Sequence, residues 1–453
     1  LNFAFTLTST AACGSIPTTP TPGTPATPTA TPLPLQCSYT PNVTQRGVVS
    51  NVFRGLDVEG CCFLCTSSEV CVAATLLMNA STQESIGECI LYSSLASDTP
   101  IPFVGSVLLQ PTSGLLNDTT AMIAFTSTLD GCRDASWDAP DVCTWKGVTC
   151  DSATHRVVAF DWGFQNCTGF LNFTLAPRGI VRITLNNNKI SGPLDLVSLP
   201  PQLQQLDVSN NVLSSTIDLT RLPSSMTELF TCSNQLYGSV DLTTLPETLQ
   251  ILFLYGNGFS GTVDLTQLPH GLQQLYLNYC NFSGSVDLTL LPEALQQLDL
   301  SVNMFEGEMN LTNLPRGLQV LYLFSNRFSG SVDLTRLPPN LADVFLNDNA
   351  LTGGVDLGHL PVFVEWLLLS NNQFSGFLNL TMSEGIEYLF VNKNNFSGPL
   401  NLEHLPPSIE VLDLSALPLM CGNTSISNGL CSNFQLPNQC RCVASWAVCP
   451  PCQ

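Results

Sequence analysis

The sequence predicts an α/β-type solenoid, mostly β, made of stacked copies of one short unit. An asparagine marks each unit and recurs every 23 residues (211 − 188), with a last step of 22 (394 − 372) and Cys280 standing in once. The pattern L-x-x-L-x-L-x-x-N surrounds it. A unit this short cannot bury its own apolar face, so successive units must stack. The marker positions are Asn188, Asn211, Asn234, Asn257, Asn303, Asn326, Asn349, Asn372 and Asn394.

This period and pattern are the signature of leucine-rich repeats. Counting back by the period gives about 11–12 repeats over residues 157–416. In each L-x-L strand the leucines point inward and the residue between them points outward. We therefore expect a curved array with short strands on its concave face and an irregular convex side, flanked by small disulfide-rich modules.

The composition excludes several classes of partner. Lys and Arg number 14 against 35 Asp and Glu, which gives a net charge of −21. Without a basic patch, binding to nucleic acid or to an anionic membrane surface is not expected. Nineteen cysteines and ten N-x-S/T sequons instead predict an extracellular or cell-surface protein of the secretory pathway. The N-glycosylation sites expected are Asn42, Asn79, Asn117, Asn166, Asn172, Asn281, Asn310, Asn379, Asn395 and Asn423.

The N-terminal residues 1–36 are not expected to pack as a domain. Residues 1–15 lack the charged start and apolar run of a signal peptide, and we interpret them as a fragment of an upstream segment. Residues 16–36 consist largely of Pro and Thr, which favours an extended linker, either mucin-like or plain. No apolar stretch of about 20 residues is present, so we expect any membrane anchor to lie outside this chain.

Residues 37–111 form a small cysteine module, with the segments G-C-C-F-L-C-T-S-S-E-V-C and G-E-C-I-L-Y. The spacing resembles the PAN/apple family, which implies binding of protein or carbohydrate. The alternative is a spacer held together by disulfides. The bridges that the resemblance implies are Cys65–Cys71, Cys61–Cys89 and, from what is left, Cys37–Cys62.

Residues 112–156 comprise a linker and a cap for the first repeat. The segment W-D-A-P-D-V-C-T-W-K-G-V-T-C-D begins at Trp137. It resembles the N-terminal cap of plant-type leucine-rich repeat ectodomains, which covers the apolar end of the solenoid. The resemblance implies a Cys143–Cys150 disulfide and leaves Cys132 and Cys167 as the remaining local pair.

Six cysteines follow the array in residues 417–453, spaced as C-x-C and C-x-x-C. This spacing suits a zinc site, but an oxidising compartment favours three disulfides in a C-terminal cap. Local pairing leaves Cys13, Cys232 and Cys280. The last two lie two repeats apart, which at about 5 Å per strand is too far for a disulfide. We expect both to be free thiols, and Cys13 to be available to an upstream domain.

The unit L-P-x-x-L-Q-x-L-x-L-x-x-N-x-F-S-G-S-V-D-L-T, over residues 157–416, resembles leucine-rich repeat surface proteins of kinetoplastids and related protists. Its part L-x-x-N-x-F-S-G also resembles plant-type repeats, although V-D-L-T replaces their usual I-P. The resemblance implies a secreted or surface-anchored protein of adhesion or recognition.

The outward positions of the predicted strands are rich in apolar residues. The central position is aromatic or leucine in seven of eleven strands, and no sequon falls on this face. Exposed aromatic residues mark binding surfaces, whereas the alternative is cross-strand stacking that stabilises the sheet. We expect the face to bind a protein or carbohydrate ligand. The candidate ligand-binding residues are Phe230, Phe253, Tyr255, Tyr276, Tyr322, Phe324, Phe345, Trp366, Leu368, Tyr388 and Phe390.

Two other columns have structural interpretations. One follows the marker asparagine and packs inside the solenoid; it consists of Phe259, Phe282, Phe305, Phe328, Phe374 and Phe396. The other is acidic and is interpreted as a row of turn caps, with calcium binding as the alternative. It consists of Asp195, Asp218, Asp241, Asp264, Asp287, Asp333 and Asp356.

The sequence contains no residue pattern that is typical of an enzyme active site. The four histidines are scattered, and no nucleophile–base pair, metal motif or phosphate loop is present. We expect a non-enzyme without catalytic residues, metal or cofactor. The expected function is ligand binding by a leucine-rich repeat ectodomain. The alternatives are a structural surface-coat glycoprotein and the sensor ectodomain of a receptor kinase.

Overall fold

A computed structural model describes residues 118–398 and 405–417 in full, together with the backbone of several strands outside these ranges. The chain divides into two compact units. One consists of Leu1–Pro17 and Asp118–Gln453, and the other of Thr18–Asn117.

The smaller unit contains a four-stranded antiparallel sheet in the order β1-β3-β2-β4. The bridges expected for the apple-like module, and the Pro/Thr linker, lie outside the described residues. The strands are β1 (Gly47–Arg54), β2 (Ala73–Met78), β3 (Ser85–Leu95) and β4 (Ser106–Leu109).

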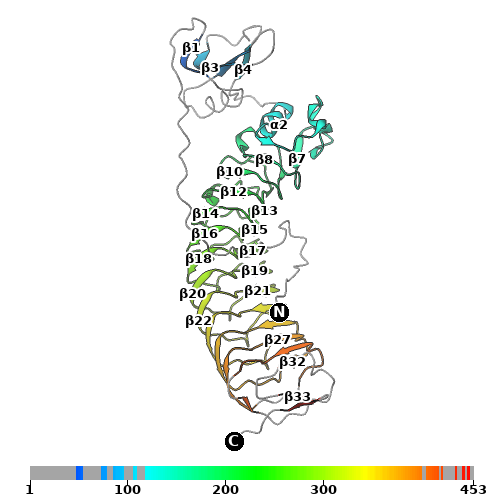
Figure 1. Ribbon diagram of the computed structural model, residues 1–453, viewed down its shortest axis with the longest axis vertical. Coiled ribbons are helices and arrows are strands. Elements are labelled where there is room, and N and C mark those ends of the chain that lie inside the picture. The colour runs from blue at the N-terminus through cyan, green and yellow to red at the C-terminus, as the bar shows by residue number, and fades with distance from the viewer. Residues whose placement is uncertain are drawn as a thin grey trace. The chain divides into compact units, whose positions relative to one another are not determined.

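The larger unit is a leucine-rich repeat solenoid, as the sequence predicted. Its fourteen-stranded sheet, here the concave sheet, places leucine opposite leucine in successive strands, as in Leu298 and Leu321. Figure 1 shows the strands stacked as rungs, with the array bending toward this sheet. The sheet is parallel except where β6 meets β7. In spatial order it runs from β6 (Val148–Cys150) through β7 (Val157–Asp161), β9 (Arg182–Thr184), β11 (Gln205–Asp207), β13 (Glu228–Phe230), β15 (Ile251–Phe253), β17 (Gln274–Tyr276), β19 (Gln297–Asp299), β21 (Val320–Tyr322), β23 (Asp343–Phe345), β25 (Trp366–Leu368), β27 (Tyr388–Phe390) and β30 (Val411–Asp413) to β32 (Phe434–Gln435).

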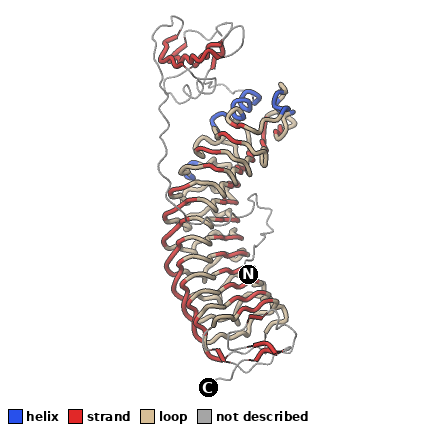
Figure 2. Tube along the Cα trace, in the orientation of Figure 1, coloured by secondary structure: helices blue, strands red, loops and turns tan. Residues whose placement is uncertain are grey.

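A second parallel sheet of eight strands lies on the opposite side of the rungs, visible in Figure 2 as a continuous edge of short strands. Its phenylalanines point into the core, and Phe259, Phe282, Phe305 and Phe328 stack at a uniform 6.2 Å between ring centroids. The predicted core column is therefore confirmed. The strands are β14 (Tyr237–Gly238), β16 (Gly258–Gly261), β18 (Asn281–Gly284), β20 (Met304–Glu308), β22 (Arg327–Ser331), β24 (Ala350–Gly353), β26 (Gln373–Gly376) and β28 (Asn395–Phe396).

The marker asparagines tie each rung to its neighbours. The Nδ2 of Asn211 donates to the carbonyls of Leu185 and Val208 at 3.0 and 3.1 Å, and its Oδ1 accepts from the N–H of Ile190 at 2.9 Å. These bonds satisfy backbone groups that no strand partner reaches. The L-P-x-x-L segments close as turns, as where the N–H of Leu272 donates to the carbonyl of Pro269 at 3.0 Å.

An aromatic cap closes the N-terminal end of the solenoid. Trp137 and Trp162 lie 4.3 Å apart between centroids, and both are buried. The cap begins with α2 (Asp118–Thr126), whose buried Asp118 accepts from both Nε and Nη2 of Arg156 at 2.8 Å. Short elements complete it, namely β5 (Leu129–Asp130), η1 (Ala135–Asp138), η2 (Val142–Thr144), β8 (Thr168–Gly169) and η3 (Phe173–Leu175).

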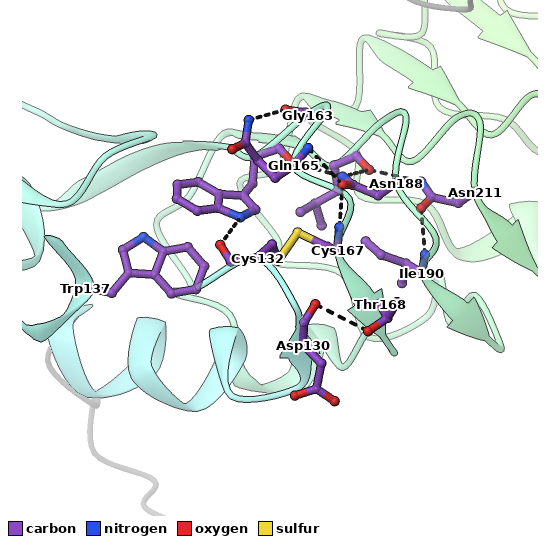
Figure 3. The surroundings of a disulfide bond; sticks show 12 residues. Asp130, Cys132, Trp137, Gly163, Gln165, Cys167, Thr168, Asn188, Ile190 and Asn211 are labelled. Carbon is purple, nitrogen blue, oxygen red and sulfur yellow. Dashed lines mark hydrogen bonds between the residues drawn. A yellow bond between two sulfur atoms is a disulfide. The ribbon is translucent and has the colours of Figure 1, made fainter. Parts of the chain in front are cut away.

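Two disulfides hold the cap, and both match the predicted pairings. One joins Cys132 to Cys167 and the other joins Cys143 to Cys150. Figure 3 shows the Cys132–Cys167 disulfide beside the marker asparagines. There the Oδ1 of Asn188 accepts from the N–H of Cys167 at 2.9 Å. Cap and repeats therefore share one hydrogen-bond network.

The remaining short elements lie along the rungs and after the last full repeat. No helix within the described residues is long and apolar enough to cross a membrane. The elements are β10 (Ser191–Gly192), β12 (Val212–Leu213), η4 (Leu219–Arg221), β29 (Gly398–Pro399), β31 (Met420–Cys421), β33 (Arg441–Val443) and β34 (Trp446–Val448).

Candidate ligand-binding surface

The central column of the concave sheet is the middle outward position of each strand. Its aromatic members lie on neighbouring strands, as the sequence predicted, but several of them are buried against one another, which is the cross-strand stacking given as the alternative. Flat rings on strands about 4.8 Å apart cover one another's faces. The buried members are Phe230, Phe253, Tyr276, Tyr322 and Phe345. The candidate residues that keep partial exposure are Tyr255, Phe324, Trp366, Leu368, Tyr388 and Phe390.

An early aromatic cluster lies on β13, β15 and β17. Phe253 stacks on Tyr276 with centroids 4.4 Å apart and meets Phe230 edge-on at 5.1 Å. Tyr255 packs against the same group, and burial raises the pKa of its hydroxyl to about 12. This cluster offers little surface to a ligand, because Phe253 at its centre is only 1% exposed.

A late aromatic cluster extends over β21, β23, β25 and β27. Tyr322 stacks on Phe345 at 4.4 Å, and Trp366 stacks on Tyr388 at 3.7 Å with 13° between the ring planes. Because Trp366 and Tyr388 are both partly exposed, their stacked edges form an accessible apolar surface. The late cluster is thus the more open of the two.

A row of carboxylates borders the late cluster where the strands begin. This acidic edge consists of Glu365, Glu387 and Glu410. Burial, then repulsion from Glu365 and Glu410, raises the pKa of Glu387. The hydroxyl of Tyr388 donates to a carboxylate oxygen of Glu410, and that of Tyr322 donates to Asp343 at 3.1 Å. Sequence analysis missed this row, although an acidic residue just before the L-x-L strand in three successive repeats was its visible signal.

Two buried aspartates of the central column, Asp299 and Asp207, have carboxyl groups with raised pKa values, and sequence analysis missed their role. Asp299 lies between Tyr276 and Tyr322, and burial raises the pKa of its carboxyl to about 7. Its Oδ1 accepts from the N–H and hydroxyl of Ser301 at 2.9 and 2.5 Å. Asp207 repeats the arrangement with Ser209, and burial raises its pKa to about 6. The recurring L-D-x-S pattern was the signal in the sequence.

The prediction that Cys232 is a free thiol is wrong. It is disulfide-bonded, and its side chain has no exposed surface although it lies with Phe230 and Phe253 on the concave side. The prediction failed because it considered only Cys280 as an intrachain partner. Cys280 itself is free and buried, as predicted, and burial raises the pKa of its thiol to about 12.

The acidic column on the far side of the rungs has the predicted capping role. The Oδ1 of Asp287 accepts from the N–H and hydroxyl of Thr289 at 2.9 and 2.7 Å, and these bonds lower the pKa of the carboxyl. Asn310 makes the same pair of bonds with Thr312. A neutral amide replaces the carboxylate here, so the turn needs only the oxygen acceptor.

The expected glycosylation sites that the structure describes lie away from the concave sheet. Within the described residues, the sequon asparagines are exposed, apart from the half-buried Asn172. They lie on the far-side sheet or in the turns, at Asn166, Asn172, Asn281, Asn310, Asn379 and Asn395. The other four sequons fall outside the described residues.

One group of potential metal ligands lies in the cap. Atoms of Asp141, Cys143 and His155 lie within 4.8 Å of one another. The sulfur of Cys143 is already bonded to Cys150, and His155 pairs with Asp141 at 3.2 Å. The group therefore lacks the thiolate that a metal site would need.

Comparison with known proteins matches one segment of the chain to a family model and finds solved structures with partial similarity. Residues 115–151 match the leucine rich repeat N-terminal domain, in the region where the sequence predicted a cap. No curated protein matches the chain. The kinetoplastid-type origin of the repeat and the apple-like module stay predictions.

The solved structures with similarity to this chain include the following three. A plant peptide hormone receptor, RGFR1 in complex with RGF2, is 24% identical with a TM-score of 0.49, over 56% of this chain and 42% of that one. PEPR1–AtPEP1 is 23% identical with a TM-score of 0.43, over 70% and 57%. A plant ice-binding protein is 20% identical with a TM-score of 0.46, over 63% and 88%. The chain thus covers less than two-thirds of either receptor, and at these identities the likeness concerns the fold alone.

Proposed function

We propose that this chain is an extracellular or cell-surface ectodomain that binds a protein ligand through the late aromatic cluster and the acidic edge. One observation carries the proposal. The stacked pair of Trp366 and Tyr388 keeps an accessible apolar edge directly beside carboxylates that repel one another. Aromatic residues with polar neighbours dominate the energetics of protein interfaces.

Two further features support a protein partner. The described sequons lie elsewhere, so glycans would not cover the concave sheet. The rings of Trp366 and Tyr388 are nearly parallel, so the faces they turn toward each other are not available to stack against a sugar. A protein segment can pack against ring edges and place Arg or Lys beside Glu365 and Glu410. We accordingly rank a protein ligand above a carbohydrate.

The secretory location is part of the same proposal. Disulfides at Cys132–Cys167 and Cys143–Cys150 form in oxidising compartments. The chain acts without catalysis in this proposal, as a recognition or adhesion module. A receptor-kinase sensor would use the same surface, whereas a surface-coat protein would need no ligand there.

The test uses the whole chain with a double change, Trp366→Ala with Tyr388→Ala. Its matched control is Tyr237→Ala with Phe377→Ala, which removes two rings that are 53% and 73% exposed outside the concave columns. Each protein is applied to arrays of extracellular proteins and of glycans, and circular dichroism verifies folding.

We expect the wild type and the control to retain a protein interaction that the concave variant loses. Truncating an interface residue of this kind costs roughly 1 kcal/mol or more, about a fivefold loss or greater. If the folded variant with Trp366→Ala and Tyr388→Ala binds as well as the wild type, the binding site lies elsewhere. The apple-like module would then be tested next. Binding only on the glycan array would replace the protein ligand by a carbohydrate.

A further inference from the structure

The carboxylates of the acidic edge belong to a continuous backbone ladder along the start of the concave strands. The N–H of Glu387 donates to the carbonyl of Glu365 at 3.0 Å, and the N–H of Glu410 donates to that of Glu387 at 2.8 Å. The same bond joins earlier rungs, as from Gln273 to Gln250 at 2.8 Å. Glutamine therefore fits this position of the repeat, and the fold does not require a carboxylate there. From Gln250 onward the ladder consists of Gln250, Gln273, Gln296, Gln319, Ala342, Glu365, Glu387 and Glu410.

The three carboxylates repel one another at this edge. Neighbouring strands lie about 4.8 Å apart, a distance at which two like charges repel even in water. Burial and the repulsion from Glu365 and Glu410 raise the pKa of Glu387. Within residues 118–398 and 405–417, no Lys, Arg or His side chain forms an ion pair with any of the three. A cation supplied by a ligand would offset this repulsion.

A pair of exposed apolar residues, here the turn pair, lies next to this edge along the chain. Val362 and Phe363 follow the L-P of the rung that contains Trp366, and they are 64% and 59% exposed. In the other L-P turns of the array the same two positions read P-Q, S-S, E-T, H-G, E-A, R-G, P-N and P-S. Large apolar residues that are exposed together mark interaction surfaces. Because Phe363 precedes Glu365 by two residues, the turn pair extends the acidic edge on its outer side.

The rung after the turn pair is built to lie close against it. Its marker step is 22 residues (394 − 372), where the usual step is 23 (211 − 188), and its turn ends in Gly385. A Cβ at Gly385 would lie 1.8 Å from the carbonyl oxygen of Val362, so only glycine allows this approach. The same two rungs carry Trp366 and Tyr388, which stack at 3.7 Å. A departure from the repeat, exposed apolar residues and repelling carboxylates thus gather at one place.

We propose that the acidic edge and the turn pair extend the ligand-binding surface beyond the concave sheet, and that its partner is a basic segment of another protein. The segment places Lys or Arg beside Glu365 and Glu410 in charge-assisted hydrogen bonds, and it packs an apolar side chain on Phe363. A cation at this edge also lies near the ring of Trp366, which attracts it. This inference rests on the proposed function, because it names the partner of the same surface.

A protein segment accounts for more of these features than a free cation does. A metal ion or a polyamine neutralises carboxylates but leaves Val362 and Phe363 exposed to water. Calcium also prefers six or more converging oxygens, whereas the acidic edge is a linear row of three side chains. The net charge of −21 further favours a basic partner, because it attracts one from a distance.

The first test measures the binding of short synthetic peptides to the whole chain by fluorescence anisotropy. The probes are repeats of Lys-Phe-Lys-Ser, of Lys-Ser-Lys-Ser and of Glu-Phe-Glu-Ser. The edge variant is Glu365→Gln with Glu410→Gln, which restores the glutamine of the earlier rungs. Its control is Glu293→Gln with Glu306→Gln, which removes the same charge at two exposed positions of other rungs.

We expect the wild type and the control to bind the Lys-Phe-Lys-Ser peptide more tightly than the other two peptides. The edge variant should bind it about tenfold more weakly, because two charge-assisted contacts are lost. Equal affinity of the wild type for the acidic peptide overturns the proposal. An edge variant that binds as its control does overturns it as well.

The second test concerns the turn pair, through Val362→Ser with Phe363→Ser. Its control is Val197→Ser with Leu290→Ser, which removes apolar side chains that are 47% and 60% exposed on other rungs. We expect the turn variant to lose the preference for the peptide with phenylalanine over Lys-Ser-Lys-Ser, and the control to keep it. A turn variant that keeps this preference overturns the proposal.

A third measurement separates a protein segment from a free cation. Calcium and spermine are titrated into the wild type and the edge variant by calorimetry. Binding of either that the edge variant abolishes, together with no preference for the peptide with phenylalanine, would replace the protein segment by a cation.

These outcomes are separate from that of the array experiment. If an array interaction depends on Trp366 and Tyr388 but no peptide distinguishes the edge variant from its control, the basic partner is wrong and the proposed function stands. If the peptides bind as expected but no array interaction depends on the two rings, the proposed function fails and the edge alone is the binding surface.

Discussion

The phenylalanine column and the central column of the concave sheet both place rings on successive rungs, yet they differ in regularity. The former consists of Phe259, Phe282, Phe305 and Phe328 at an unvarying 6.2 Å and about 13°. In the latter the centroid separations run from 4.4 Å for Tyr322–Phe345 to 5.1 Å for Phe230–Phe253, and an aspartate interrupts the row.

The difference reflects what each column must satisfy. A core position in a stacked array has identical neighbours above and below, so one side chain suits every rung. An outward position has only lateral neighbours and can change from rung to rung. Regular repetition therefore indicates packing, whereas variation along an aromatic column indicates a surface that has been adapted individually, as where Leu368 follows Phe345.

The largest expected effect comes from breaking the regular column. Phe282→Ala removes a fully buried ring held between Phe259 and Phe305, and the rigid rungs limit collapse around the cavity. We expect a loss of about 3–5 kcal/mol in the free energy of unfolding, measured by chemical denaturation. Phe282→Leu is the matched control, because leucine fills this column at Leu351 and should cost less. Equal losses for Ala and Leu would contradict the packing interpretation.

The second largest effect is expected at Asp299, the buried aspartate in the central column of the concave sheet. Burial raises the pKa of the Asp299 carboxyl to about 7, whereas an aspartate in an unfolded chain has a pKa of about 4. Between these values the folded state binds more protons than the unfolded state, so stability falls as pH rises. Asp299→Asn keeps the oxygen acceptor for Ser301 and removes the charge. We expect it to raise the melting temperature at pH 8 and to change it little at pH 4.

The size of that effect is roughly 1–4 kcal/mol, since each pKa unit corresponds to about 1.4 kcal/mol. Asp287→Ala is the control of opposite sign. Hydrogen bonds lower the pKa of Asp287, so the stability it contributes is lost as pH falls through its folded value. An Asp299→Asn protein with the pH profile of the wild type would show that the carboxylate is ionised without cost.

How much of this molecule the sequence predicts depends on whether a feature repeats. The period located the strands, the core phenylalanines and the turn-capping aspartates, because each recurs at a fixed place in every rung. The bidentate pair of Asp118 and Arg156 does not recur and was not predicted. The disulfide of Cys232 was missed for the same reason, since a cysteine occupies this position of the repeat only once in the array. The burial of Tyr322 was missed because alternation gives the direction of a side chain but not the stacking of rings.

A smaller effect is expected in the turn between the two columns. The residue before the marker asparagine adopts a positive φ, at 54° for Asn371 and 53° for Val302. A β-branched residue is strained there, whereas asparagine tolerates the conformation. Val302→Asn should raise the free energy of unfolding by about 1 kcal/mol, and Asn371→Val should lower it by a similar amount. A stabilised Asn371→Val protein would contradict this account.

The smallest effect is expected on the far side of the rungs, where neither column is touched. Asp287→Asn keeps the oxygen that accepts from Thr289, and Asn310 already performs this role in the next repeat. We expect no measurable change in melting temperature near neutral pH, with or without added calcium. A calcium-dependent rise in the wild type that Asp287→Asn abolishes would show that the stacked carboxylates bind the ion. The acidic column would then be a second adapted surface rather than a row of turn caps.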